Sequence, residues 1–285
     1  MQPFISKAQP FVDIVALNTQ NFFSNYKDSS QSPVYIQDNF LNLFIPKKFG
    51  KGHVFLLRFN SEQLTINRAG QPTGIFQLYS FSIPIGLQLV SKNQKWKYTG
   101  IIIPKINSDL RDDVKNDFQL GGIGLVARVF NENLQVKFGL YYNREFFGNF
   151  FMPLAGVDWK INSRFQMYGT LPSNFRMEFK LSQKWNTGLG FRSFTRSFRL
   201  SENYNNDFIW VRENQAKVYV EGFILKNVIA TFDVYRSIGY RLPRNDFYNH
   251  GIEKITNPIF ANFNDNFGFT IGFAYRILTK KDPDK

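Results

Sequence analysis

The chain of 285 residues has no cysteine, only two histidines and no long apolar run. Without cysteine, it can form neither a disulfide framework nor a cysteine-based metal site. A membrane-spanning helix needs about 20 consecutive and mostly apolar residues, and because no stretch approaches that length we exclude a helical membrane protein. The first residues, "MQPFISKAQPF", lack the apolar segment of a secretory signal. We therefore expect either a cytoplasmic protein or a chain whose signal peptide has been removed.

Large apolar side chains alternate with small or charged ones along many segments. In the last of them, "NFGFTIGFAYRIL", every second position from Phe267 to Ile277 is large and apolar, whereas the positions between hold glycine, threonine, alanine or Arg276. The segments "FRMEFKLS", "QVKFGLYYN" and "SFSIPIGLQL" follow the same rule. A period of two places the two sets on opposite faces of a β-strand. The aromatic fraction of 18%, which is high for a soluble domain, raises the question of which medium the apolar face meets.

The length of the alternating segments separates a membrane barrel from a soluble sandwich. Sandwich strands typically have about five or six residues, whereas many segments here run to roughly nine to fifteen, enough for a tilted strand to cross a bilayer. In hydrocarbon, only a helix or a closed barrel leaves no backbone N–H or C=O group unpaired. We therefore predict an all-β protein, a transmembrane antiparallel β-barrel with an apolar outer face and a polar interior.

The segmentation predicts fourteen strands, and bacterial single-chain barrels have an even number. The number depends on the shortest segment, Phe165–Thr170, because the barrel would have twelve strands if this segment and one neighbouring segment did not form strands. We expect a single barrel domain over 11–278, a periplasmic N-terminal segment over 1–10 and a periplasmic C-terminal tail over 279–285. The expected strands are 11–23, 33–46, 53–67, 75–90, 96–107, 118–130, 134–145, 150–161, 165–170, 174–182, 185–199, 208–224, 228–243 and 266–278.

The inward face of the predicted strands carries both signs of charge. Opposite charges on adjacent strands favour an ion-pair ladder that fills the interior, and a selectivity filter for anions is the alternative. The predicted lumen-lining residues are Arg176, Glu178, Lys180, Arg192, Arg196, Lys217, Tyr219, Glu221, Asp233 and Arg276.

Catalytic and cofactor-binding patterns are scarce in this sequence. The two histidines, His53 and His250, fall at opposite ends of the predicted barrel and cannot readily share a site with a serine or an aspartate. "DFYNHGIE" has no recognised ligand spacing, and in "LGGIGL" we interpret Gly122 and Gly124 as thin lumen or bend positions rather than a phosphate-binding loop. We expect no catalytic residue, no metal and no cofactor.

The net charge of +13 is distributed unevenly on this topology. If both termini are periplasmic, the short turns such as "SKNQK" and "LKN" form a basic periplasmic rim, and the acidic "NSDLRDDVKND" lies at the other end. Basic groups at a membrane surface attract anionic headgroups. We expect outer-membrane lipids, including lipopolysaccharide, and other envelope proteins as partners. Nucleic acid is not expected, because the aromatic residues that would stack on bases are assigned to lipid.

The longest connection, Arg244–Asp265, is too apolar for a freely solvated loop. We interpret it as a contact surface for a partner protein, and a loop folded over its own barrel mouth is the alternative. The candidate contact residues are Phe247, Tyr248, Ile252, Ile255, Phe260 and Phe263.

Three stretches resemble an uncharacterised family of outer-membrane β-barrel proteins of Bacteroidota. They are "FSIPIGLQL", "FFMPLAGVDWKINSRFQMYGTLPSNFRMEFKLSQKWNTGLGFR" and "FGFTIGFAYRIL". The resemblance implies a location in the bacterial outer membrane, a signal peptide already removed and insertion by the barrel assembly machinery. With the scarcity of catalytic patterns, it favours a non-enzymatic accessory or scaffold subunit of a larger envelope assembly. A narrow, anion-preferring channel for small solutes is the alternative, and a barrel enzyme ranks third.

Overall fold

The computed structural model of the protein describes residues 11–25, 34–68, 75–204, 206–243, 260–262 and 264–278. Across these ranges, no helix has the length and apolar character needed to cross a membrane. The two helices described, η1 (Val114–Asn116) and η2 (Glu202–Tyr204), are single 3₁₀ turns in connections between strands.

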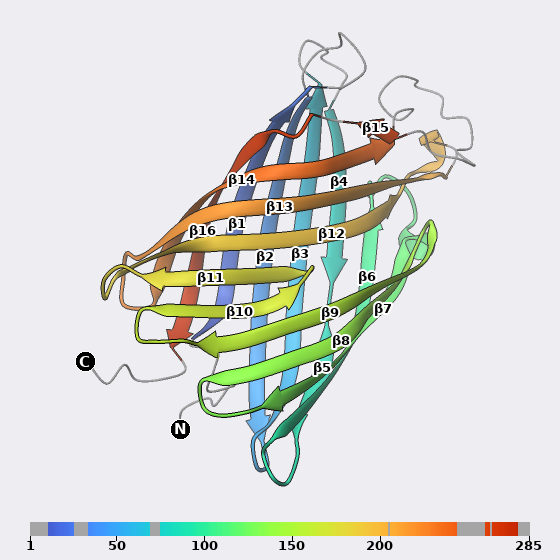
Figure 1. The fold of residues 1–285 in the computed structure, drawn as a ribbon. Helices are drawn as coiled ribbons and strands as arrows, with labels where there is room; N and C mark the ends of the chain where they lie inside the picture. Colours follow the sequence, from blue (N-terminus) through green and yellow to red (C-terminus); the bar gives the residue numbers. More distant parts are fainter. Residues whose placement is uncertain are drawn as a thin grey trace.

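Almost all other described residues lie in one antiparallel sheet (Figure 1). Two of its segments, β4 and β5, form one interrupted strand, because both pair with β3 and β6. The short β15 pairs only with the end of β14. The strands are β1 (Phe11–Ser24), β2 (Val34–Phe49), β3 (His53–Arg68), β4 (Ile75–Ser82), β5 (Ile85–Val90), β6 (Trp96–Ser108), β7 (Phe118–Val129), β8 (Leu134–Glu145), β9 (Gly148–Lys160), β10 (Phe165–Leu171), β11 (Asn174–Lys180), β12 (Trp185–Arg199), β13 (Phe208–Phe223), β14 (Val228–Pro243), β15 (Phe260–Asn262) and β16 (Phe267–Leu278).

The sheet closes on itself where the first and last strands meet. β1 pairs with β16 from Phe11 opposite Leu278 to Phe22 opposite Gly268. With β4 and β5 counted once and β15 set aside, fourteen strands form the closed barrel. The prediction of fourteen strands is confirmed, and β10 is the short strand on which that number depended. Closure leaves the barrel wall without a free edge at this seam, as a spanning sheet requires.

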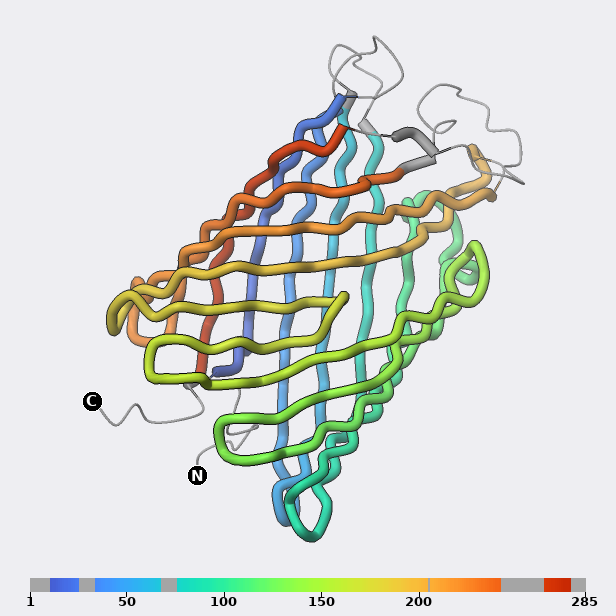
Figure 2. Tube along the Cα trace, viewed as in Figure 1, coloured from blue at the N-terminus to red at the C-terminus, as the bar shows by residue number. Residues whose placement is uncertain are grey.

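Short turns gather at one end of the barrel, which we call the turn end, and longer connections at the other, the loop end (Figure 2). Side chains of Asn and Ser fix the short turns: Asn162 Oδ1, for example, accepts hydrogen bonds from the backbone N–H groups of Arg164 and Phe165, both at 2.8 Å. Two connections on the side of the loop end, 146–147 and 172–173, are also short, and the second lies part-way along the wall because the β10–β11 hairpin stops there (Figure 1). The turns at the turn end are 50–52, 91–95, 130–133, 161–164, 181–184 and 224–227.

The two faces of β16 differ sharply in exposure. The side chains of Phe267 and Ile271 are 62% and 46% exposed, whereas Arg276 is 2% exposed. A strand alternates its side chains between faces, so the aromatic and aliphatic set covers the outside and the small or charged set lies within. The same pattern continues around the barrel, with Leu87, Phe138 and Phe232 exposed on the outer face of their strands.

A charge on the outer face should destabilise the barrel according to its depth. Replacing Ile271 by arginine is expected to cost about 2–4 kcal/mol of folding free energy, because this residue lies in the middle of β16 and a lipid-facing cation near the midplane is poorly solvated. Phe267→Arg, at the end of the same strand, is the matched control and should cost about 1 kcal/mol or less. Urea unfolding of the protein in lipid vesicles measures both; equal costs would contradict this register.

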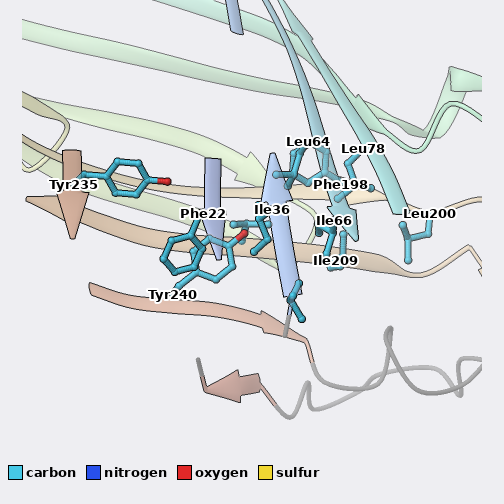
Figure 3. Packing of buried hydrophobic residues seen from close by; sticks show 12 residues of the cluster. Phe22, Ile36, Leu64, Ile66, Leu78, Phe198, Leu200, Ile209, Tyr235 and Tyr240 are labelled. Carbon is cyan, nitrogen blue, oxygen red and sulfur yellow. The ribbon is translucent and has the colours of Figure 1, made fainter. Parts of the chain in front are cut away.

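The loop end of the barrel has an apolar interior (Figure 3). Phe22, Ile36 and Leu64 point inward from β1, β2 and β3, and they meet side chains of β12 to β14. The expectation of a polar interior along the whole barrel is therefore wrong at this end. The full cluster is Phe22, Val34, Ile36, Leu64, Ile66, Leu78, Phe198, Leu200, Ile209, Val211, Tyr235 and Tyr240.

A pairing between β12 and β6, the β12–β6 bridge, explains how water can be excluded from the interior of the loop end. The β10–β11 hairpin has only seven residues in each strand, so the last part of β12 has no β11 partner beside it. There Arg199 of β12 pairs in parallel with Ser108 of β6. The pairings β6, β4, β3, β2, β1, β16, β14, β13, β12 and back to β6 thus close a smaller ring at the loop end. Every strand residue of the apolar cluster belongs to this ring, and its narrow bore lets opposite walls touch.

Candidate functional site

Below the apolar cluster, charged side chains fill the lumen in layers. The layer nearest the turn end is built on Arg276 of β16. Its guanidinium donates to both carboxylate oxygens of Asp13, at 2.6 and 3.0 Å, and to Glu221 Oε2 at 2.7 Å. Arg176 donates to the other oxygen of Glu221 at 2.7 Å. Glu221 therefore joins two arginines, and charge-assisted bonds of this kind are the strongest that side chains form.

Glycines on β12 allow Arg176 of β11 to reach Glu221 of β13. The register places Gly190 between Arg176 and Lys217, and Gly188 between Glu178 and Tyr219. A Cβ atom at Gly188 would lie 2.7 Å from the hydroxyl of Tyr219 and 2.0 Å from the carbonyl oxygen of Met177, which is too close. Because β12 presents no side chain there, the ion pair crosses over it. Adjacent-strand pairing alone does not predict this contact.

A second layer lies next to the apolar cluster. Arg196 of β12 donates to Asp38 Oδ2 at 2.7 Å and contacts Glu62 Oε1 at 2.8 Å. Arg192 lies four residues earlier on the same face of β12. Its guanidinium lies over the rings of Phe40 and Phe194, 4.9 and 4.8 Å from their centroids. Stacking on aromatic faces suits the weakly hydrated guanidinium. β12 thus holds both arginines against the opposite wall formed by β2 and β3.

Three further ion pairs lie among the described residues of the lining. Lys217 and Asp233, on the neighbouring strands β13 and β14, approach to 3.2 Å. The other two are Lys105 with Glu145 at 3.1 Å and Lys137 with Asp158 at 2.6 Å, on the β6 to β9 side. Sequence reasoning missed these last two pairs together with Asp13, Asp38 and Glu62. All of these residues except Asp13 occupy inward positions in the alternation of their strands, so that pattern would have found them. Asp13 points inward because the register of β1 shifts between Asp13 and Val15, and simple alternation would place it on the outer face.

The structure places all ten residues predicted to line the lumen on the inward face of their strands. Six of them meet in ion pairs: Arg176, Arg196, Lys217, Glu221, Asp233 and Arg276. Glu178 accepts hydrogen bonds from Gln166 and Tyr168, Tyr219 is fully buried beneath Arg176, and Lys180 is half-buried on the same face.

Other expectations have different outcomes. Gly121 and Ile123 of β7 face inward, where they pair with Asn143 and Tyr141 of β8. Gly122 and Gly124 alternate with them and therefore lie on the outer face, so their interpretation as lumen positions is wrong. Of the residues proposed to contact a partner, Phe247, Tyr248, Ile252, Ile255 and Phe263 lie outside the described residues. Phe260 is the first residue of β15, where it pairs with Pro243.

Two connections at the loop end, 109–117 and 200–207, are joined by hydrogen bonds beside the β12–β6 bridge. Asp109 Oδ2 accepts hydrogen bonds from the backbone N–H and the hydroxyl of Ser201, at 3.1 and 2.8 Å, and the N–H of Asp109 donates to the carbonyl of Arg199 at 3.1 Å. Burial raises the pKa of the neighbouring Asp117 above its usual range; the charge of Asp109 adds to this, and a hydrogen bond from Ser108 opposes it. The two acidic connections are therefore tied to one another.

The histidine that the structure describes has a structural contact. His53 Nδ1 accepts a hydrogen bond from the N–H of Val90 at 3.0 Å, which ties the start of β3 to the end of β5. His250 lies outside the described residues. Among the residues that the structure does place, no three His, Cys, Asp or Glu side chains gather as metal ligands would.

Fold and lumen together define an outer-membrane type of β-barrel, with fourteen antiparallel strands and an interior filled by side chains of its own wall. The chain belongs to the family described as a domain of unknown function (DUF6268), which matches residues 50–276. A search of curated proteins finds no match.

A solved structure of an outer-membrane channel shares this fold. The COG4313 outer membrane channel from Pseudomonas putida F1 has a TM-score of 0.50 and 10% identity, over 97% of this chain and 100% of that one. The NanC porin has a TM-score of 0.39 and 5% identity, over 92% and 100% of the two chains. The outer membrane channel DcaP of Acinetobacter baumannii has a TM-score of 0.31 and 6% identity, over 97% and 100%. At 10% identity the likeness to the COG4313 channel concerns the fold alone, and the two lower TM-scores support no conclusion.

Proposed function

We propose that the protein is an integral barrel of the bacterial outer membrane, delivered there by a signal peptide that has been removed, in a member of the Bacteroidota. The exposed apolar side chains around the barrel and the absence of a free edge at the seam support this location. The turn end faces the periplasm in this proposal, because such barrels keep their short turns there. Exposed basic residues of that end, such as Lys51, Lys92 and Lys184, suit anionic headgroups or an acidic partner.

We further propose that the barrel is a non-enzymatic accessory or scaffold subunit that does not conduct. One observation carries this proposal: the charged side chains of the lumen are paired and shielded from water. Glu221, Asp233 and Arg276 are each 2% exposed, whereas a water-filled pore leaves its lining charges accessible. The apolar cluster lies above them, so buried ion pairs and apolar side chains follow one another along the described part of the lumen. A narrow anion channel is the alternative, and it requires these side chains to move apart.

The wild-type protein is expected to give little or no conductance in planar bilayers. Replacing Arg192, Arg196 and Arg276 together by serine should open a conducting path, because these side chains span the lumen. As a matched control, replacing the exposed residues Arg128, Arg144 and Arg164 together by serine should produce no conductance. Robust conductance of the wild-type protein, with preference for anions, would favour the channel.

Isolation from native outer membranes in mild detergent tests the scaffold role. A different envelope protein that copurifies in fixed proportion would support it, and lipopolysaccharide that stays bound would identify the lipid partner. If the barrel purifies alone and also conducts, the scaffold proposal fails.

A further inference from the structure

Eight outward side chains on β1 to β4 are polar but uncharged, and they form two adjacent rows across the strands. The inward neighbours of these residues, Gln20, Asp38, Leu64 and Leu78, are buried, so the two rows point away from the lumen. We call them the amide rows. One row is Thr19, Asn39, Gln63 and Tyr79, and the other is Asn21, Gln37, Thr65 and Gln77.

The amide rows lie within the apolar band of the outer face. On the side toward the turn end, the next row begins with Leu17 and Leu41, and Leu17 is 52% exposed. On the side toward the loop end, Phe23 is 55% exposed and its ring lies 4.7 Å from that of Tyr35. Exposed aromatic pairs mark the membrane interface of such barrels. On the neighbouring β16, Ile271 is opposite Thr19, so the same row continues with an exposed aliphatic side chain.

Part of this hydrogen-bonding capacity is unused. The hydroxyl of Tyr35 donates to Asn21, and that of Tyr79 donates to Gln77. The side-chain amides of Gln37, Asn39 and Gln63 form no hydrogen bond with any part of the chain that the structure describes. Lipid tails offer no donor or acceptor, so polar side chains at this depth are stabilised by pairing with another protein surface.

We propose that the amide rows are the surface through which two copies of this chain associate side by side in the membrane. An acidic or basic partner would find no opposite charge in the two rows. By contrast, each amide carries both a donor and an acceptor, so the surface is complementary to itself about a twofold axis, as an interface between identical subunits must be. Leu17, Leu41 and Phe23 flank the rows and would supply apolar contacts. This inference does not rest on the lumen being closed.

The number of copies in a complex can be counted directly. Because the chain has no cysteine, Lys92→Cys in an exposed turn carries one dye, and the full chain is refolded into phosphatidylcholine vesicles that contain no other protein. Most complexes of this labelled protein should bleach in two steps. Adding Gln37→Leu, Asn39→Leu and Gln63→Leu should lower the two-step fraction at least tenfold. The matched control adds Val126→Leu, Val136→Leu and Phe138→Leu on the outer face of β7 and β8, and it should remain dimeric.

Single-step bleaching of the parent protein, or a dimer that survives the three leucine substitutions, would overturn the proposal. Heat-dependent migration on gels checks that each variant is folded. Should the leucine variant not fold, Gln63→Glu serves instead, because it opposes two like charges across the interface; it must also lower the two-step fraction. A different protein captured by these rows in native membranes, with monomers in the vesicles, would overturn the proposal as well.

Discussion

Replacing Glu221 by alanine is expected to lower the free energy of unfolding by about 3–5 kcal/mol. Its carboxylate is the shared partner of Arg176 and Arg276, and both guanidinium groups approach it to 2.7 Å in a buried setting. Removing one member of a buried ion network leaves the others uncompensated, which costs far more than the loss of an exposed pair. Urea unfolding of the protein in lipid vesicles measures the change.

Glu202→Ala is the matched control for this experiment, because it removes the same side chain from an exposed position in η2. It should change the free energy of unfolding by about 0.5 kcal/mol or less. If Glu221→Ala were equally mild, water would have to solvate Arg176 and Arg276 in the variant, and the lumen could not be the sealed interior described above.

Phe198→Ala is expected to cost about 3–5 kcal/mol, the range for truncating a large buried aromatic side chain. Phe198 has no exposed surface and contributes to the apolar cluster at the loop end. Phe130→Ala, in a turn where the ring is 59% exposed, is the control and should cost about 1 kcal/mol or less. Equal costs in the same unfolding measurement would mean that the loop end is wet and the smaller ring is not closed.

Much of the barrel could be predicted from the sequence because the strand period is a local property. Each strand repeats its own alternation, so even the short β10 could be predicted, at 165–170 against Phe165–Leu171 in the structure, and polar turn residues marked the ends of the strands. The inward face followed from the same pattern: once Phe267 and Ile271 were assigned outward, Arg276 had to point inward. This reasoning needs no knowledge of which strands are neighbours.

The partners across the lumen could not be predicted in this way. Arg196 meets Asp38, which lies 158 residues earlier in the chain, and this contact depends on the β12–β6 bridge rather than on either strand. The sequence of β2 also does not show which of its faces meets lipid, because the apolar Ile36 points inward while the polar Gln37 and Asn39 point outward. Alternation identifies two faces, but at the loop end only the narrowing of the barrel determines which face is dry.

The β12–β6 bridge has a consequence for biosynthesis. The smaller ring joins β1 to β4 and β6 with β12, β13, β14 and β16, so its contacts join residues that are far apart in sequence. Closing such long loops is entropically expensive, and structures with many distant contacts form slowly. A partly synthesised chain has the apolar residues of β1 to β4 but none of the strands that cover them. We therefore expect the incomplete chain to need protection against aggregation until its final strands are available.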